Sequence, residues 1–304
     1  MKDIRFTLAI FVIAFAGCEL IIEPDLPNHT PRLVIKAFFT PDRGWAASVS
    51  RSAGILDPSP GPERLVTGAN VELLSEGRII DRLSFLQRER VYASEKHLQA
   101  GRSYSLRASA PGFETVHASD IIPGMVPTSV VSYHLETSDS DHGDPGVIEI
   151  TDFLIKLRIQ DPPGEENWYQ IRVIVPDRWG RHDKHFSTRD ASIVADNRIE
   201  DPVLEGVEPF VGSEPFFKDI LFDGESHEIE LSLTHFEIEA SQERKIWLQI
   251  RHISEVYYKH LRSALLQKTT DDNPFAEPVR IYSNIENGYG IFAGFSARTF
   301  ELTF

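Results

Sequence analysis

The sequence predicts a mainly β protein in which an N-terminal β-sandwich is followed by a larger antiparallel β domain with one α-helix in its C-terminal half. Three observations lead to this prediction. Short segments of alternating apolar and polar residues recur between turn residues along most of the chain. Cys18 is the single cysteine among 304 residues, so no intrachain disulfide can form and the fold must rely on a hydrophobic core. Helical spacing of apolar residues is convincing in one place, residues 254–268.

The first eighteen residues have the anatomy of an export signal. Two basic residues precede an apolar run over residues 6–16, which is too short to cross a bilayer but fits the hydrophobic region of a signal peptide. The run ends with the sequence FAGC at residues 15–18, which resembles a bacterial lipobox. We therefore expect residues 1–17 to be a lipoprotein signal peptide and Cys18 to be lipidated. An ordinary secretory signal with a chance cysteine is the alternative.

The segment that follows and the net charge limit the contacts of the mature chain. Residues 18–31 contain three prolines and no periodic apolar pattern, which predicts an extended tether. The whole chain has 31 basic and 46 acidic residues, a net charge of −15, and removing residues 1–17 takes away two basic residues and one acidic residue, leaving −16. Such a chain is repelled by phosphate backbones, which disfavours nucleic-acid binding. No later stretch approaches the ~20 apolar residues of a membrane helix, so we expect membrane contact through Cys18 alone.

The predicted sandwich domain spans residues 32–123. Residues 32–39 are rich in β-branched and aromatic side chains, and residues 70–86 read as a hairpin that turns at Glu76-Gly77. Short strands separated by turn residues are typical of a small antiparallel sandwich. In this respect the segment resembles immunoglobulin-like or transthyretin-like modules, a likeness of fold that carries no function. In a later strand, alternation places three apolar residues on one face: Tyr104, Leu106 and Ala108.

The predicted second domain spans residues 124–304, and prolines at positions 123 and 127 mark its start. Residues 219–233 give a second hairpin signal, whereas residues 176–213 show little periodicity and predict loops and short strands. Ser254 can cap a helix over residues 255–268 with one apolar stripe packed on the sheet. Further strands are predicted at 130–135, 153–160, 168–175 and 245–252 and at the C-terminus.

Two segments have the composition of metal sites, but both favour a solvated loop. His182 and His185 are three residues apart with Asp183 between them, yet zinc would need a further ligand, and the adjacent basic residues would repel a cation. Residues 139–144 are rich in oxygen ligands, but their glycine comes fifth where a calcium-binding EF-hand loop needs it sixth. We therefore expect no metal and no cofactor, with His182 and His185 as the candidates if zinc binds.

The sequence contains no local signature of catalysis. Patterns such as G-x-S-x-G, H-E-x-x-H and the phosphate-binding glycine loops are missing, and the neighbouring carboxylates of Glu165 and Glu166 point apart on a turn. Among the tryptophans, Trp179 lies at a turn between charged residues, where an exposed ring could contact a ligand. We therefore expect binding rather than catalysis, with Trp179, Arg178 and Arg181 as candidate contact residues.

The closing part of the chain contains a set of short motifs. They are Tyr257-Tyr258, Asn273-Pro274-Phe275, Glu277-Pro278, Ser283-Asn284-Ile285, Asn287-Gly288 and Gly290-Ile291-Phe292. With these motifs the chain resembles a family of bacterial lipoproteins of unknown function, the DUF4249-like lipoproteins of Bacteroidota-type Gram-negative bacteria. The resemblance extends over nearly the whole mature chain and is most specific near its end. The family implies an outer-membrane lipoprotein, often encoded near TonB-dependent-type receptors, with no established activity or catalytic residues.

From these observations we expect an outer-membrane-anchored binding or accessory protein that works beside a receptor protein. Lipidation would hold it at high local concentration near that partner. A surface-anchored hydrolase acting on glycans or peptides and a structural envelope protein are the alternatives. The sequence does not identify the ligand, nor the face of the outer membrane on which the protein lies.

Overall fold

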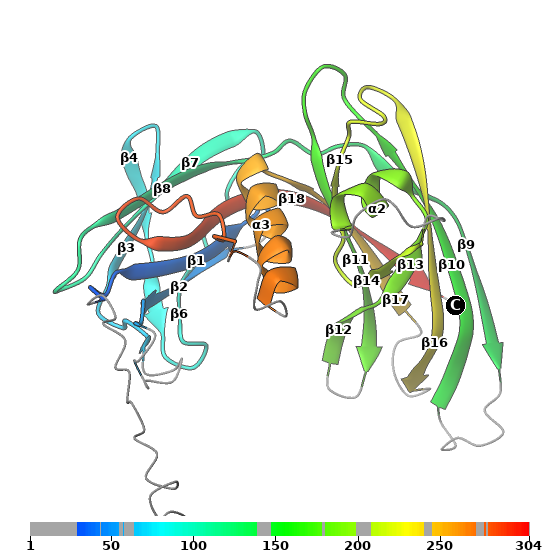
Figure 1. Ribbon diagram of the computed structural model, residues 1–304, viewed down its shortest axis with the longest axis horizontal. Helices are drawn as coiled ribbons and strands as arrows, with labels where there is room; N and C mark the ends of the chain where they lie inside the picture. The colour runs from blue at the N-terminus through cyan, green and yellow to red at the C-terminus, as the bar shows by residue number, and fades with distance from the viewer. Residues whose placement is uncertain are drawn as a thin grey trace, which may run out of the picture. The chain divides into compact units, whose positions relative to one another are not determined.

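The C-terminal strand of the chain is shared by two β-sandwiches. The computed structural model describes residues 29–42, 44–54, 57, 64–138, 147–177, 180–198, 208–239, 245–271, 277 and 279–303. In it, β18 (Tyr289–Thr303) runs parallel to β1 (Leu33–Phe39) over its first part and antiparallel to β17 (Lys245–Ile253) over its second part (Figure 1). A single mixed sheet therefore passes through both sandwiches. Its other strands are β2 (Trp45–Arg51), β5 (Ser84–Leu86), β6 (Val91–Ser94), β11 (Trp168–Asp177), β12 (Gly180–Lys184) and β15 (Phe216–Lys218).

The N-terminal sandwich packs one end of the mixed sheet against a four-stranded sheet. That second sheet has the order β4-β3-β7-β8, formed by β3 (Asn70–Ser75), β4 (Arg78–Arg82), β7 (Arg102–Ser109) and β8 (Val116–Ile122). Its inner residues include the predicted apolar set of β7, Tyr104, Leu106 and Ala108, which is buried against β1 and β2. Alternation with period two is thus confirmed as the source of this core.

The predicted hairpin at Glu76-Gly77 is present, but its second strand divides between two sheets. Glu76 and Gly77 have φ angles of 51° and 75°, which is the left-handed backbone that a tight two-residue turn requires. Leu83 is buried between β4 and β5, and β5 then pairs with β6 in the mixed sheet. The strand predicted over residues 78–86 therefore crosses from one layer of the sandwich to the other.

The C-terminal sandwich packs the other end of the mixed sheet against a five-stranded sheet with the order β14-β13-β16-β10-β9. Its core is formed by alternate residues of the long strands, such as Phe153, Ile155 and Leu157 facing Ile171 and Val173. The strands of this second sheet are β9 (Thr128–Ser138), β10 (Val147–Gln160), β13 (Phe186–Thr188), β14 (Phe210–Gly212) and β16 (Ser226–Glu239).

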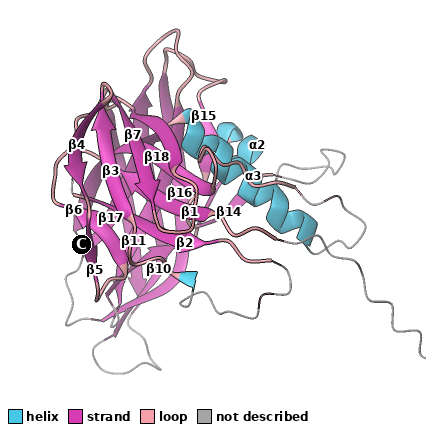
Figure 2. Ribbon diagram, turned by 90° about the vertical axis from the view of Figure 1, so that its left-hand side faces the viewer, coloured by secondary structure: helices cyan, strands magenta, loops and turns pink. Residues whose placement is uncertain are grey.

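Two helices lie together on one side of the strands (Figure 2). The predicted helix is α3 (Glu255–Asp271), and the Ser254 hydroxyl caps it by accepting a hydrogen bond from the Tyr257 amide at 3.1 Å. A second helix, α2 (Ala191–Asn197), lies in the region for which loops and short strands were predicted, and the Asp190 side chain caps it. The Tyr258 hydroxyl of α3 donates to Asp196 of α2 at 3.0 Å and so ties the helices together.

Two further details concern the C-terminal half. The hairpin predicted over residues 219–233 is wrong, because residues 219–224 form a turn that leads from β15 in the mixed sheet to β16 in the five-stranded sheet. Gly290 and Gly294 lie where β18 approaches neighbouring backbone closely. A Cβ atom at Gly290 would lie 1.9 Å from the Ile35 carbonyl oxygen, and one at Gly294 would lie 2.2 Å from that of Ile121.

The mainly β fold class with sandwich layers is confirmed. Residues 31–304 form one unit of tertiary contacts, and the division into domains at residue 123 stays a prediction. Cys18, the signal peptide and most of the tether lie outside the described residues. None of the helices that the structure describes has the length and apolar character needed to span a membrane.

Candidate functional site

The candidate site is an open groove of about 520 Å³ on the face of the mixed sheet against which α3 packs. Strands β11, β17 and β18 form its floor because their alternate residues point away from the core of the C-terminal sandwich. Its lining combines three arginines, one carboxylate, neutral polar groups and apolar side chains. The lining residues are Thr40, Asp42, Arg172, Ile174, Gln249, Arg251, Phe295, Ala297, Arg298 and Thr299.

Two strands bring the same tripeptide to this groove. Residues 170–172 of β11 and residues 249–251 of β17 both read Gln-Ile-Arg, and in both strands the isoleucine points into the core. The antiparallel register places Gln170 opposite Arg251 and Arg172 opposite Gln249. Each arginine therefore reaches the groove face with the glutamine of the other strand beside it.

Arg251 is buried, with 7% of its surface exposed, and it is held by neutral groups. Its Nη1 donates to the side-chain oxygen of Gln170 at 2.9 Å, and its Nε donates to that of Gln249 at 2.8 Å. The guanidinium carbon lies 4.7 Å from the centre of the Phe295 ring. Burial lowers the pKa of Arg251. Within the described part of the chain, no carboxylate forms an ion pair with it.

Arg172, by contrast, is neutralised by two carboxylates. Its Nε lies 2.8 Å from an oxygen of Asp183 on β12 and 2.7 Å from one of Glu214. Burial alone would lower the pKa of Arg172, but Asp183 and Glu214 outweigh that effect and raise it. The two arginines thus share a sequence context and a face of the sheet, and differ in their charge compensation.

A buried hydrogen-bond network fixes the helix that borders the groove. The Asp120 carboxylate of β8 accepts from the Ser254 hydroxyl at 2.5 Å and from the Gly294 amide at 2.8 Å. Ser254 is the residue that caps α3, so this carboxylate joins the N-terminal sandwich, the start of α3 and β18. Burial raises the pKa of Asp120 to about 6. From α3, Tyr257 packs against Phe38 and Phe295 and forms the inner wall beside the groove.

A cluster of three carboxylates joins the end of β10, which Asp161 follows, to the turn between β15 and β16, which holds Asp219 and Asp223. Oxygens of Asp161, Asp219 and Asp223 lie within 4.8 Å of one another, which is close enough to surround a cation. Asp161 accepts hydrogen bonds from the Tyr169 hydroxyl and, at 2.9 Å, from the Gly224 amide. Asp219 and Asp223 accept from backbone amides of the facing loop, those of Asn167 and Gly164. These bonds lock two loops together, and we interpret the cluster as structural.

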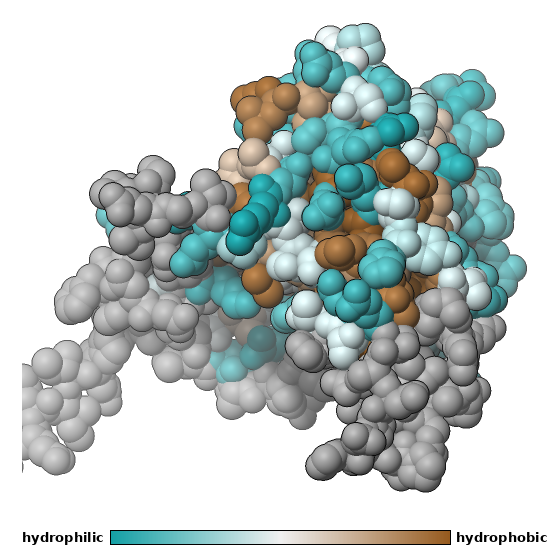
Figure 3. Space-filling view, turned by 90° about the vertical axis from the view of Figure 1, so that its right-hand side faces the viewer, coloured by the Kyte–Doolittle hydropathy of each residue, from teal (hydrophilic) through white to brown (hydrophobic). Residues whose placement is uncertain are grey.

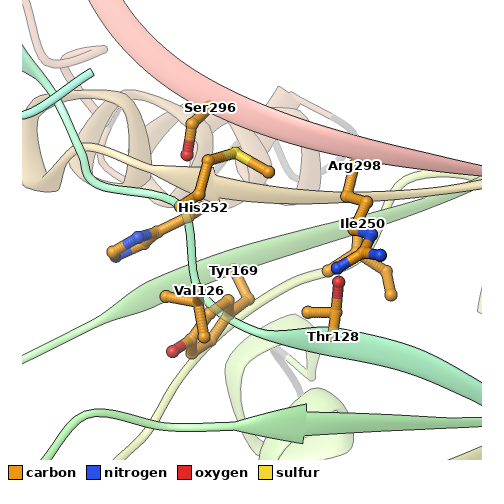
Figure 4. Close-up of a pocket in the computed structure, with 8 residues that line it drawn as sticks. Val126, Thr128, Tyr169, Ile250, His252, Ser296 and Arg298 are labelled. Carbon is orange, nitrogen blue, oxygen red and sulfur yellow. The ribbon is translucent and has the colours of Figure 1, made fainter.

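The other cavities fit a ligand less well. The space lined by Thr128, Tyr169, His252 and Arg298 is about 10 Å³, near the lower limit for one water molecule (Figure 4). Thr128 points its hydroxyl toward Arg298 there, and its buried oxygen has no protein partner (Figure 4). An open hollow of about 580 Å³ on the outer face of β16 is lined by acidic residues such as Glu228. Hydrophilic and hydrophobic residues are mixed on the side of the molecule shown in Figure 3.

Most of the residues predicted from the sequence as candidate ligand contacts or metal ligands lie away from the groove or outside the residues that the structure describes. Arg178, Trp179 and residues 139–144 are outside the described residues. Arg181 is exposed, and its guanidinium carbon lies 3.7 Å from the centre of the Trp247 ring. His182 and His185 are exposed and belong to no group of three potential ligands among the described residues. Their role in zinc binding stays a prediction, and Asp183 between them is held by Arg172.

Comparison with known proteins gives a family and little else. The sequence model of a family described as "Domain of unknown function (DUF4249)" matches residues 20–301. The comparison with curated proteins found no match. Among solved structures, the crystal structure of a Salmonella alpha-2-macroglobulin mutant is similar at 11% identity over 75% of this chain, with a TM-score of 0.25. The aligned part of this chain spans 14% of that protein's length, and a likeness at this TM-score carries no argument.

Proposed function

Since the chain belongs to the DUF4249 family, a domain of unknown function, we propose that it is an outer-membrane lipoprotein that binds a ligand beside a TonB-dependent-type receptor. In this proposal the protein catalyses no reaction. Cys18 anchors it, and residues 18–31 hold the folded part at a short distance from the membrane. Several acyl chains on Cys18 are needed, because a single chain gives only marginal binding.

The observation that carries the binding role is the groove at Arg251. It combines a volume suited to a small ligand, charged and polar side chains held in fixed positions by strands, and a smaller apolar part formed by Ile174, Phe295 and Ala297. The one hydroxyl–carboxylate contact among the described side chains that line it joins Thr40 to Asp42 at 3.3 Å, and that threonine is only 3% exposed. Among the described residues, the lining holds no serine, cysteine, histidine or lysine that could act as a nucleophile or as a base for it. Recognition is therefore the function that this geometry supports best.

A surface-anchored hydrolase would need carboxylates that converge on an open cleft. Among the described residues, the best converging group is Asp161, Asp219 and Asp223. Asp161 and Asp219 are 2% and 3% exposed, and both accept hydrogen bonds that hold loops together. This burial favours the binding function over the hydrolase.

Co-purification tests the receptor partnership. The tagged full-length protein would be extracted from membranes in mild detergent, with the Cys18→Ser variant as the matched control. We expect an outer-membrane receptor to accompany the wild-type protein in stoichiometric amount and to be lost with Cys18→Ser. A wild-type protein that emerges alone, together with a soluble Cys18→Ser protein that turns over a substrate in a hydrolase screen, would reject the proposal in favour of the enzyme.

A further inference from the structure

We propose that the groove is a site for a small organic acid, in which Arg251 binds one carboxylate and the apolar wall formed by Phe295, Ala297 and Ile174 holds the hydrocarbon part. This inference rests on the proposed binding function and names its class of ligand. Its evidence is the position of a buried guanidinium at the floor of an open groove.

The comparison of the two Gln-Ile-Arg segments carries the argument. Arg172 and Arg251 lie on the same face of neighbouring strands, and both line the groove. Arg172 has two carboxylate partners, whereas the buried Arg251 has two amide oxygens, the Tyr257 hydroxyl and an aromatic ring. Asp183 and Glu214 thus pair with Arg172 and act on Arg251 only from a distance, so Arg251 has no carboxylate in direct contact among the described residues and a ligand carboxylate can take that place.

The cost of burying a charge explains why this difference matters. A guanidinium taken out of water loses hydration, and neutral amides satisfy its N–H groups without cancelling its charge. Arg251 has five N–H donors. The two glutamines accept from Nε and Nη1, and the Tyr257 hydroxyl is also hydrogen-bonded to the guanidinium, so these three partners do not use all five donors. A carboxylate matches the planar fork of arginine, and such charge-assisted hydrogen bonds are among the strongest in proteins.

The surrounding charges favour a single carboxylate over a polyanion. Asp183 and Glu214 pair with Arg172 and, together with Asp42 in the lining, would repel additional negative charge, while Arg298 is the remaining basic side chain of the lining. The groove volume of about 520 Å³ lies within the range of small-molecule sites. Next to the guanidinium, the Phe295 ring and Ala297 offer an apolar surface, while the hydroxyl of Thr299 accepts from Gln249 at 3.1 Å and fixes that amide.

The test uses three probes of similar shape and different charge: benzoate, benzamide and benzylamine. Each is titrated into the full-length protein in detergent, with binding followed by isothermal calorimetry and by amide NMR shifts. We expect benzoate to bind roughly tenfold or more tightly than benzamide, because one charge-assisted hydrogen-bond pair contributes at least about 1.5 kcal/mol. The shifts should centre on residues 249–251 and 295–299. Equal affinity for benzoate and benzamide, or no benzoate binding up to millimolar concentrations, would overturn the inference.

Three variants assign the binding to Arg251. Arg251→Met should abolish benzoate binding, Arg251→Lys should retain part of it because the charge stays but the fork is lost, and Arg78→Met at an exposed position of β4 should change nothing. Circular dichroism checks that each variant is folded. Full benzoate affinity in a folded Arg251→Met protein would reject the site. Where that variant does not fold, the comparison of benzoate with benzamide on the wild-type protein decides.

A further binding experiment distinguishes two sources of the carboxylate, a free small acid and the C-terminus of a peptide. The tripeptide Gly-Gly-Phe with a free carboxylate is compared with its C-terminal amide on the same protein. We expect benzoate to bind at least as tightly as the tripeptide, whereas a preference for the tripeptide would replace the small acid with a chain end. These measurements need no receptor, so their failure would leave the co-purification result intact. A protein that purifies without a receptor would likewise not affect the evidence for carboxylate binding in the groove.

Discussion

Gln170 on β11 and Arg251 on β17 lie directly opposite each other in the antiparallel register, joined by a 2.9 Å hydrogen bond from the guanidinium to the amide oxygen. Both side chains are almost fully buried. A neutral amide thus occupies the position where a buried arginine usually meets a carboxylate. This arrangement leaves Arg251 without a described carboxylate in direct contact at the floor of the groove, and it is the basis of the function proposed for the protein.

The half-buried carboxylate of Asp120 predicts a stability that depends on pH. Because its pKa in the folded protein is about 6, above the usual 3.8, the native state binds more protons than the unfolded state between these values. The free energy of unfolding should therefore be largest below pH 4 as far as this group is concerned. It should fall as the pH rises through 6, by on the order of 2 kcal/mol.

The Asp120→Asn variant isolates this effect. Urea unfolding of both proteins between pH 4 and 8 should show a decrease in stability with pH that is smaller by about 2 kcal/mol in the variant. Glu114→Gln, at an exposed position, serves as the control and should follow the wild-type curve. Parallel curves for wild type and Asp120→Asn would contradict the assignment of a raised pKa to Asp120.

Close packing of β18 on β1 predicts that Gly290 cannot be replaced. An added Cβ would lie 1.9 Å from the Ile35 carbonyl oxygen, and the φ angle of 108° is strained for any other residue. Gly290→Ala should lower the free energy of unfolding by about 3 kcal/mol or more. Gly124→Ala is the matched control, since no atom lies within 4 Å of its added Cβ. Similar urea midpoints for the two variants would show that β18 does not approach β1 as described.

The hydroxyl of Tyr169 should matter through the buried carboxylate of Asp161. Tyr169→Phe removes the donor and leaves an acceptor oxygen without its partner in the core, which should cost about 1–3 kcal/mol of stability. Tyr133→Phe removes a hydroxyl from a side chain that is 43% exposed and should cost less than about 1 kcal/mol. Thermal unfolding of both variants measures the difference, and equal costs would argue against the loop-locking role of Asp161.

The same carboxylate cluster predicts no response to calcium. The carboxylate oxygens of Asp161, Asp219 and Asp223 accept hydrogen bonds from backbone amides of two loops. A bound cation would have to displace these hydrogen bonds. A site filled a hundredfold above its dissociation constant would raise the stability by about 2.7 kcal/mol. We expect the melting temperature to stay unchanged when millimolar calcium replaces EDTA. A rise of several degrees would make the cluster a cation site.

Local sequence patterns predicted the elements well where they were long and periodic. The apolar stripe of α3, the cap at Ser254 and the turn at Glu76 all follow from residue types and spacing. The short helix α2 was missed because seven residues show too little periodicity, although Asp190 before Ile193 and Val194 is a capping signal. The groove could not be predicted, since it depends on pairing strands that are 79 residues apart, from Gln170 to Gln249. The repeated Gln-Ile-Arg tripeptide, on which no prediction was based, is a sequence signal that could have drawn attention to these two strands.

Anomalous diffraction from crystals soaked with a bromobenzoate tests the central claim most directly. The bromine gives its position without reference to any assumed pose. The account predicts a bromine peak in the groove beside Phe295 and Ala297, with the carboxylate on the guanidinium of Arg251. A groove without bromine under conditions that place the ligand elsewhere on the protein, or a carboxylate turned away from Arg251, would contradict it.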